Sequence, residues 1–572
     1  MLAKKVTALL VSAALVLTLL AGCGGSKALS QVIADLLSGL YTNVDVEVDS
    51  DLTAALKKAA AEGGTEDEIL TRLVNNLNIT GGSITFTRLG DGQQGDHGVD
   101  LVFQTGSDPD AAARSALAQW ASVFGSLPDD GSYRAHVSMI EAEGGYYIAV
   151  DVEVLKAGTP DKDDPEPKPD YTYDEASNTY TVYTAAGLQE WAKAAEKDLS
   201  TNCTLGSNIT LTGNWTHIGT DSSHAYTGTF DGNGKTITGL TINSSSRYVG
   251  MFGYFDGTVK DLKLASVSIT SSWSDKTYAA VGAVAGYITS SSTINGCSVS
   301  GSITINGANS NAGGLAGQNY GSISNCWVKD LTIKVPSSNG RLGGVVGSNS
   351  KTVEDCHVEN LTITNGTNVG GVAGQTSSSS SALTGCSVKD SSVTGSSISG
   401  GVVGNFSSGE VAGCSVESTT VATDGIFGTS GGVIGSQTGG TAMTCYFANG
   451  WINNTGAFSP KLGGVAGAQT GGRLIACYST GGGNLDTSNS TYAGGVVGNK
   501  SSSSNVTACY WSGQQTNAFG SSSLGGGNAT HVTNNGDGDT VTWAEALEGL
   551  NNAASASGYQ FDGTMDAPFL SK

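Results

Sequence analysis

Basic side chains are scarce in this sequence. Its 572 residues include 28 Lys and Arg against 50 Asp and Glu, which gives a formal net charge of -22. Proteins that bind nucleic acid contact the phosphates mainly with Lys and Arg, and this chain has few of them to offer. We therefore expect no nucleic-acid partner, and we interpret the acidity as a property that keeps the chain soluble.

Long apolar runs are almost absent too. The single long run covers residues 6–20, follows two lysines and ends at the sequence Leu-Ala-Gly-Cys at 20–23. A charged start, a short apolar core and small residues before a cleavage point are typical of a secretion signal, and the run is too short to span a bilayer comfortably. Since no second such run follows, we expect the mature chain not to cross a membrane again.

The Leu-Ala-Gly-Cys sequence resembles the lipobox of bacterial lipoproteins. This resemblance implies that residues 1–22 are a signal peptide and that diacylglycerol is attached to the thiol of Cys23. Residues 23–28 then form a lipidated, flexible tether. The resemblance predicts a bacterial protein of the cell envelope, exposed on the extracytoplasmic side, with the membrane as its first partner.

Residues 29–156 combine helical and strand-like apolar patterns and predict a small α+β domain. Helical spacing and a capping-box sequence predict helices over 29–40, 65–77 and 109–126. Apolar alternation predicts strands around 84–86, 99–103 and 147–154. The two histidines of this region, His97 and His136, have no cysteine or acidic motif at metal spacing, so we interpret them as surface residues. We expect neither a metal nor another cofactor.

Residues 157–172 are rich in proline and acidic side chains. Proline removes backbone hydrogen bonding from helices and strands, and neighbouring carboxylates repel one another. The stretch therefore predicts an extended linker that holds the second part of the chain away from the anchor.

Beyond Cys23 and Cys203, the remaining cysteines recur at a nearly constant interval. The spacings are 29, 30, 30, 28, 31, 32 and 32 residues. The members are Cys297, Cys326, Cys356, Cys386, Cys414, Cys445, Cys477 and Cys509. A second mark, Gly-Gly followed by two apolar or small residues and Gly, keeps the same interval from 313–317 to 494–498. Self-similarity at this interval indicates stacked structural units.

The apolar residues within a repeat show the shape of the unit. One repeat has Ile323, Cys326, Val328, Leu331 and Ile333, and the next repeat matches it position for position. Steps of two, typical of a strand with one face inward, alternate with steps of three, which place a bend between strands. Parallel crossovers favour right-handed winding. We predict a mainly β chain, with a right-handed parallel β-helix of about ten coils and roughly 50 Å over 205–530 after the α+β domain.

These repeats resemble the GLUG-motif repeats of bacterial surface proteins. Gly314-Leu315-Ala316-Gly317 matches the motif, Gly-Leu-any-Gly, most closely, and residues 228–237 resemble the lead-in strand and turn of such proteins. The resemblance covers about residues 180–570 and implies a β-helix in an adhesin-like protein. Similar repeats flank protease domains in some secreted peptidases, but the chain has no HExxH zinc motif, so that chemistry is not expected.

The ends of a solenoid expose strand edges and need covers. An amphipathic helical pattern around Trp191 predicts an N-terminal cap over 173–204. The capping-box sequence at 542–545 opens a second helix and predicts a C-terminal cap over 531–572. With both ends covered, we expect the chain to be complete.

The eight repeat cysteines face the core in this interpretation. Stacked thiols about 5 Å apart are close enough for disulfides, whereas a metal site needs several thiolates converging on one point. We expect a structural ladder of buried, reduced cysteines without metal, with some disulfides as the alternative.

The residue after each repeat cysteine should point outward. Toward the end of the chain this position is taken by three successive tyrosines, Tyr446, Tyr478 and Tyr510. Aromatic rings on one face stack on sugar rings or contact a protein, so these three are the candidate ligand-binding residues. The alternative is that they pack on one another and stiffen the sheet.

Acidic residues are few in the repeats. Asp330 and Asp390, at equivalent places two repeats apart, are better interpreted as solvated bends than as a catalytic pair. We therefore predict a lipid-anchored surface protein, not an enzyme, that binds an extracellular glycan or a surface protein. A polysaccharide lyase or glycoside hydrolase on a β-helix, and a purely structural envelope protein, are the alternatives.

Overall fold

The computed structural model describes residues 29–571 except for gaps at 39, 78, 80–81, 159–168, 276, 308, 336–339, 457–458, 481–483, 486–491, 522–526 and 564–567. The chain divides into two compact units, 1–167 and 168–572. The predicted signal peptide, Cys23, the tether and most of the predicted linker lie outside the described residues. Within the described part, no helix is both long and apolar enough to span a membrane.

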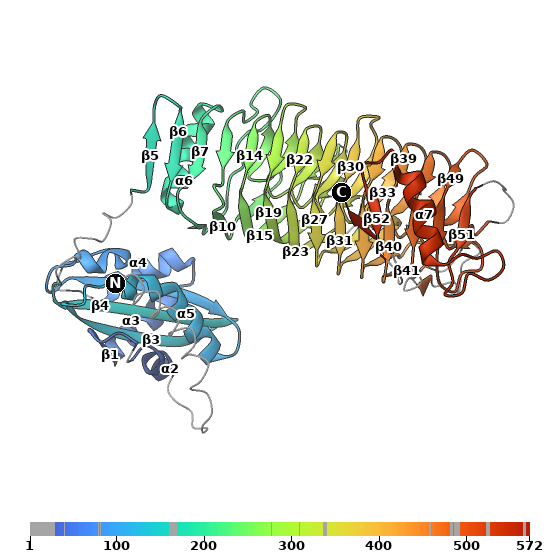
Figure 1. Ribbon diagram of the computed structural model, residues 1–572. Helices are drawn as coiled ribbons and strands as arrows, with labels where there is room; N and C mark the ends of the chain where they lie inside the picture. The colour runs from blue at the N-terminus through green and yellow to red at the C-terminus, as the bar shows by residue number, and fades with distance from the viewer. Residues whose placement is uncertain are drawn as a thin grey trace, which may run out of the picture. The chain divides into compact units, whose positions relative to one another are not determined.

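The first unit is a small α+β fold, as predicted (Figure 1). Its four strands form one sheet in the order β1-β3-β4-β2, with β1 parallel to β3 and the other neighbours antiparallel. In chain order its elements are α2 (Leu29–Leu37), β1 (Val44–Val48), α3 (Ser50–Ala61), α4 (Glu66–Leu77), η1 (Phe86–Asp91), β2 (His97–Thr105), α5 (Pro109–Gly125), β3 (Ser132–Ala142) and β4 (Gly145–Lys156).

Helices pack on both faces of this sheet. Alternation along β3 and β4 turns Val137 and Val150 toward α2 and α5. It turns Ile140 and Ala149 toward α3 and α4 on the opposite face. Beyond these two residues the α3/α4 face continues into charged side chains, which form the polar network described below.

The second unit is a parallel β-solenoid whose coils pair in register along its length (Figure 1). One side is a nine-stranded sheet, with one strand from each of nine coils. Its strands are β13 (Phe252–Phe255), β17 (Ala285–Ile288), β21 (Ala316–Asn319), β25 (Val346–Asn349), β29 (Ala373–Thr376), β33 (Val403–Phe406), β38 (Ile434–Gln437), β43 (Ala466–Gln469) and β48 (Val497–Lys500).

A second side is a 13-stranded sheet, in which only the first pair, β5 and β6, is antiparallel. Its strands are β5 (Tyr171–Asp174), β6 (Thr179–Val182), β7 (Asn202–Leu205), β9 (Thr229–Asp231), β14 (Thr258–Lys260), β18 (Thr293–Asn295), β22 (Ser322–Ser324), β26 (Thr352–Glu354), β30 (Ala382–Thr384), β34 (Glu410–Ala412), β39 (Thr441–Met443), β44 (Arg473–Ile475) and β49 (Asn505–Thr507).

The remaining strands complete the coils and pair in parallel with their counterparts in neighbouring coils. They are β8 (Ile209–Thr210), β10 (Thr236–Thr238), β11 (Thr241–Ser244), β12 (Tyr248–Val249), β15 (Lys263–Ser271), β16 (Ala279–Val281), β19 (Ser298–Ile305), β20 (Ser310–Gly313), β23 (Trp327–Lys334), β24 (Gly340–Gly343), β27 (His357–Glu359), β28 (Thr362–Gly370), β31 (Ser387–Lys389), β32 (Ser392–Gly400), β35 (Ser415–Glu417), β36 (Thr420–Thr423), β37 (Thr429–Gly431), β40 (Tyr446–Ala448), β41 (Trp451–Asn454), β42 (Lys461–Gly463), β45 (Tyr478–Ser479), β46 (Asn484–Leu485), β47 (Tyr492–Gly494), β50 (Cys509–Trp511) and β51 (Ala529–His531).

The bend before each repeat cysteine is made by a residue in the left-handed backbone region. Asn325, Asp355 and Gly385 have φ values of 53°, 47° and 63°. Asparagine, aspartate and glycine adopt this conformation more readily than other residues. The step of three in the apolar pattern is therefore a turn, and it keeps Ile323 and Cys326 in one continuous core.

The paired glycines are required by the close spacing of the coils. A Cβ atom added at Gly371 would lie 2.1 Å from the carbonyl oxygen of Gly401, and one added at Gly401 would lie 2.0 Å from that of Gly432. The same contact recurs at the second glycine of each pair from Gly314 to Gly464. Because backbones touch at this corner, even a methyl group does not fit there.

The first coil is covered by α6 (Ala185–Lys197), in the place of the predicted N-terminal cap. Thr184 caps this helix, since its side chain accepts a hydrogen bond from the amide of Gly187. Leu188 and Trp191 are fully buried in the solenoid core, and the Trp191 ring lies edge-on to Phe230.

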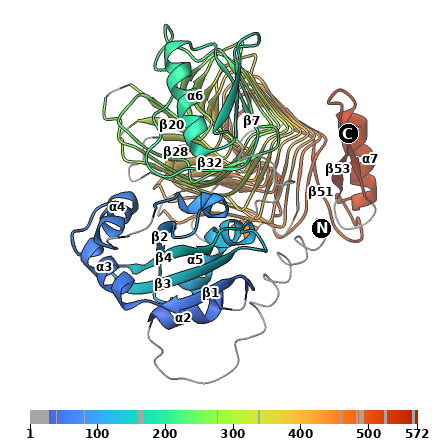
Figure 2. The same cartoon turned by 90° about the vertical axis from the view of Figure 1, so that its left-hand side faces the viewer.

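The C-terminal helix α7 (Trp543–Ala554) is a lateral cover, not the end cap predicted over 531–572. It begins at the predicted capping box of Thr542 and Glu545. It then packs against the side of the coils with the hairpin of β52 (Gln560–Asp562) and β53 (Phe569–Ser571) (Figure 2). The last complete coil is followed instead by residues 512–521 and 527–532, in which Phe519 pairs with Val497 and β51 pairs with β50.

Lys500 gives the last strand of the nine-stranded sheet a buried charge. Gln437, Gln469 and Lys500 are cross-strand partners in successive coils, and Gln469 donates a hydrogen bond to Gln437 at 3.1 Å. Lys500 is 1% exposed, and its Nζ lies 5.5 Å from the centre of the Phe519 ring. An inward-pointing charge on an edge strand discourages a further strand from pairing there.

We expect Gly401→Ala to destabilise the second unit strongly. The added methyl group would meet the carbonyl oxygen of Gly432, and overpacking a close-packed site costs about 1–3 kcal/mol. Urea unfolding followed by circular dichroism would measure the loss, with Ser379→Ala at an exposed position as the matched control. Equal unfolding midpoints for the two variants would contradict the steric explanation.

Candidate functional site

The residues after the repeat cysteines form a row on the outside of the coils, as their positions predict. We call this row the cysteine flank. Its members are Ser298, Trp327, His357, Ser387, Ser415, Tyr446, Tyr478 and Tyr510. Parallel register makes each member the cross-strand neighbour of the next.

Two tyrosines of the cysteine flank, Tyr446 and Tyr478, are covered in this structure. The rings of Tyr446 and Tyr478 stack with centroids 5.0 Å apart and an interplanar angle of 1°. The two residues are 4% and 0% exposed, because Leu550 of α7 and Phe561 of β52 pack over them. Tyr510 is partly buried at the edge of the same cluster. The three tyrosines predicted to bind a ligand thus form the surface on which the C-terminal segment packs.

The last coils are adapted to receive that segment. Their bend residues are Thr444, Ala476 and Ala508, with φ values of 53°, 51° and 48°. A side chain with a Cβ is strained in this region, and a β-branched one most of all. Thr444 donates a hydrogen bond to Ser557 at 2.8 Å, and Ala476 belongs to the apolar cluster beneath α7. Two of the three bends, Thr444 and Ala476, thus lie in contact with the C-terminal segment.

Earlier coils leave the cysteine flank open. Trp327 is 48% exposed, and its ring lies 4.5 Å from that of His357, centroid to centroid. His357 is held in turn by a 2.7 Å hydrogen bond between its Nδ1 and the Ser387 hydroxyl. A large aromatic side chain is therefore held in place on an exposed, flat surface.

Charges alternate beside this open part. Lys329, Glu359, Lys389 and Glu417 are cross-strand neighbours in successive coils. Lys329 and Glu359 form an ion pair at 3.2 Å. Ion pairs at the surface contribute little to the free energy of unfolding. The row therefore gives the cysteine flank a mixed charge pattern and adds little stability.

The eight repeat cysteines are buried and free, as is Cys203. Their thiols donate hydrogen bonds to nearby carbonyl oxygens, as Cys414 does to Leu383 at 3.4 Å. Burial raises the pKa of Cys414 and of Cys445 well above the usual value, which keeps both thiols protonated. Among the described residues, no group of three or more His, Cys, Asp or Glu side chains is arranged to hold a metal ion.

Asp330 and Asp390 occupy bends of the coils. Their φ values are 52° and 49°, in the left-handed region that Asp tolerates. Asn360, which lies at the same bend in the coil between them, donates a hydrogen bond to Asp330 at 2.5 Å. These contacts agree with the interpretation of both residues as structural bends.

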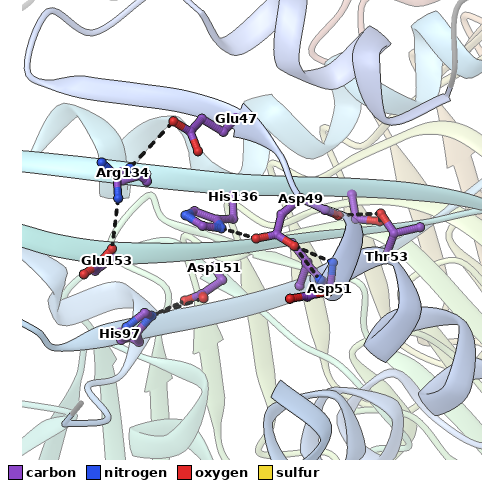
Figure 3. A network of polar contacts seen from close by, with 11 residues as sticks. Glu47, Asp49, Asp51, Thr53, His97, Arg134, His136, Asp151 and Glu153 are labelled. Carbon is purple, nitrogen blue, oxygen red and sulfur yellow. Dashed lines mark hydrogen bonds and ion pairs between the residues drawn. The ribbon is translucent and has the colours of Figure 1, made fainter. Parts of the chain in front are cut away.

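The first unit contains a polar network that the sequence pattern does not reveal. His97 pairs with Asp151 at 3.1 Å, and His136 pairs with Asp49 (Figure 3). Arg134 reaches Glu153 at 3.6 Å on the same face of the sheet. Both histidines are partly exposed, at 20% and 23% of their side chains, but each faces a carboxylate, which the prediction of surface residues did not include. Asp151 lies on β4 and Asp49 caps α3, both far from the histidines in the chain, and local spacing carries no signal of these contacts.

Two carboxylates of this network have opposite pKa shifts. Burial raises the pKa of Asp151, and the nearby His97 offsets this only in part. Burial acts in the same direction on Asp49, but hydrogen bonds from the Leu52 amide and from His136 outweigh it and lower the pKa of that carboxyl. Asp49 also caps α3 through the amides of residues 51 and 52. The network thus connects the helix to the sheet.

Comparison with protein families supports the repeat pattern. The family model of the GLUG motif matches residues 308–334, the segment from β20 through β23. This chain is a GLUG-repeat β-helix protein. The match covers one coil, and the register of the remaining strands shows that the same unit is repeated along the solenoid.

One solved structure similar to this GLUG-repeat protein is that of a proposed immunoglobulin A1 protease from Bacteroides ovatus. The similarity covers 50% of this chain and 77% of that chain, with 16% sequence identity and a TM-score of 0.30. A likeness of this degree carries no argument about activity. No curated protein matches the chain.

We expect Asp49→Ala to lower the stability of the first unit by about 1–2 kcal/mol near neutral pH, mainly through the lost helix cap. Because the pKa of Asp49 is lower in the folded chain, its contribution is present above the unfolded pKa and is lost as the pH falls through the folded value. Calorimetry between pH 2 and pH 7 would measure both effects. Similar midpoints for variant and parent at neutral pH would contradict the assignment.

Proposed function

We propose that this GLUG-repeat protein is a lipid-anchored, non-catalytic surface protein that binds an extracellular protein through the open part of the cysteine flank. The lipobox at 20–23 supports the anchor, and the acidic, proline-rich stretch supports a spacer between anchor and β-helix. The β-helix then serves as a rigid platform whose outward positions form rows.

The observation that carries the proposal is that one part of the cysteine flank already binds a protein segment. The C-terminal segment packs on Tyr446 and Tyr478 through Leu550 and Phe561, with aromatic rings at the centre of the contact. Aromatic anchors with a polar surround are typical of binding hot spots. Trp327 offers such an anchor in the part that remains open, surrounded by alternating charges.

A catalytic role has less support on this surface. Hydrolysis of a glycosidic bond uses two carboxylates placed across one bond. On the open flank Asp330 and Asp390 serve as bends, and Glu359 is paired with Lys329. We therefore propose binding without catalysis for this surface.

We expect Trp327→Ala to weaken binding of the protein partner by about tenfold or more. Removing a Trp anchor from a binding hot spot commonly costs about 2 kcal/mol of binding free energy or more. Cells displaying the full chain would be tested on surfaces coated with fibronectin, collagen or fibrinogen. Trp451→Ala removes an equally exposed tryptophan, 53% against 48%, from another strand and is the matched control. Adhesion that survives Trp327→Ala, or that falls equally in the control, would count against the proposal.

We expect Cys23→Ala to release the protein from the membrane, since the thiol that carries the lipid is absent. Partition between detergent and aqueous phases would measure this, with the parent chain in the detergent phase and the variant in the aqueous phase. Ser26→Ala, three residues downstream in the tether, is the control and should partition like the parent. A variant that stays in the detergent phase would refute the lipid anchor.

A further inference from the structure

A second aromatic surface lies in the first three coils of the nine-stranded sheet. Tyr254 of β13 and Tyr287 of β17 are cross-strand partners, and Tyr320 directly follows β21. The centroids of the first two rings are 4.5 Å apart, and those of Tyr287 and Tyr320 are 5.1 Å apart, stacked in both cases. The register partner of Tyr287 in the next coil is Gln318, so Tyr320 reaches the stack from two residues further along the chain.

A fourth ring stands across the stack and forms a cleft with it. The plane of Tyr248 lies at 78° to that of Tyr254 and at 66° to that of Tyr287. With Arg247 and Asp221, the rings line a cleft of about 710 Å³, which we call the tyrosine cleft. Sites for small molecules have volumes of about 300–1,000 Å³.

The walls of the tyrosine cleft are aromatic and polar rather than aliphatic. Besides the four tyrosines they contain Thr220, Asp221, Ser222, Arg247 and Gln318. A carbohydrate has matching surfaces, since its C–H faces stack on aromatic rings and its hydroxyl groups hydrogen-bond to polar side chains. An aliphatic ligand would leave those polar groups without partners.

The charged groups of the cleft are already engaged within the protein. The guanidinium of Arg247 lies 5.1 Å from the centre of the Tyr248 ring, and its Nε donates to a backbone carbonyl oxygen at 3.4 Å. Asp221 accepts hydrogen bonds from the amides of Ser223 and His224 at 2.8 and 3.1 Å. The Ser223 amide above all holds the pKa of Asp221 below its usual value, and this carboxylate also pairs with His224 at 3.1 Å. Together with Arg247 it gives the cleft one charge of each sign, so its lining has no excess of positive charge to attract an anionic ligand.

Tyr320 is the exposed end of the stack. It is 41% exposed. In the next coil Asn349 is the cross-strand partner of Asn319, so Ser350 occupies the position that corresponds to Tyr320. Because Ser350 has no ring, the aromatic stack ends at Tyr320. Burial raises the pKa of Tyr287 well above the usual value, so its hydroxyl remains a hydrogen-bond donor.

We propose that the tyrosine cleft binds a neutral oligosaccharide, one without carboxylate, sulfate or phosphate groups. A pyranose ring stacks on the outer face of Tyr320, and the polar rim, Gln318 included, hydrogen-bonds to the sugar hydroxyls. The three stacked rings of the cleft lie on or directly after strands of the nine-stranded sheet, whereas Trp327 lies on β23 of another sheet. The β-helix therefore has a second site, with a ligand chemistry of its own.

Isothermal titration of the full chain with neutral gluco-, galacto- and manno-oligosaccharides tests the proposal, with heparin and oligogalacturonate as anionic probes. We expect saturable binding of at least one neutral probe and none of the anionic probes. Tyr320→Ala should weaken that binding about tenfold, while Tyr320→Phe, which keeps the ring, should stay within about threefold.

Trp327→Ala is the control for the cysteine flank and should leave oligosaccharide binding unchanged. Thermal unfolding checks the fold of each variant, and Gln318→Ala provides a second test if Tyr320→Ala lowers the midpoint. The proposal is overturned if no neutral probe binds, if only anionic probes bind, or if the Tyr320→Ala and Gln318→Ala variants bind like the parent. None of these results bears on the proposed function, because the adhesion assay of the Trp327→Ala variant tests that function separately.

Discussion

Direct contact between the backbones of successive coils is the constraint on which the solenoid depends. Parallel hydrogen bonding places neighbouring strands about 4.8 Å apart, and at the glycine corner this spacing leaves no room for a Cβ atom. The carbonyl oxygen of Gly432, 2.0 Å from a Cβ added at Gly401, shows how close the approach is. Since the coils cannot slide past one another without moving this corner, core and flank positions remain aligned from coil to coil, and the register shifts only locally, as between Leu264 and Val267.

Alignment turns each repeat position into a row, and the residues that occupy a row decide what it does. The inward row after the bend contains thiols, whose size fits a shared core. The row that ends at Lys500 closes with two buried amides, Gln437 and Gln469, and a terminal charge. The cysteine flank changes character along its length, from an exposed Trp327 to a Tyr478 buried beneath α7. One backbone geometry thus supports a core, an edge and two different surfaces.

The first unit has no repeats, and its polar contacts are not arranged in rows. Its polar network joins residues that are far apart in the chain, such as Asp49 and His136, on one face of an irregular α+β sheet. No repetition aligns these groups, and each pair depends on a particular strand order, β1-β3-β4-β2. Here a single substitution, at Asp49, affects a helix cap and a contact with strand β3 together.

The repeating pattern determined the solenoid from the sequence, because apolar steps of two and three are read locally and each coil repeats them. Bends such as Asn325, the inward cysteines and the capping box of α7 follow from the same local rules. The surface on which α7 packs does not follow from local rules. An amphipathic helix shows that it needs an apolar partner but does not show which one. Tertiary structure alone decided that Tyr478 is covered, that Trp327 is open and that Tyr248 stands across the stack of Tyr254 and Tyr287. Exposure depends on what the rest of the chain packs against, and that information is not local.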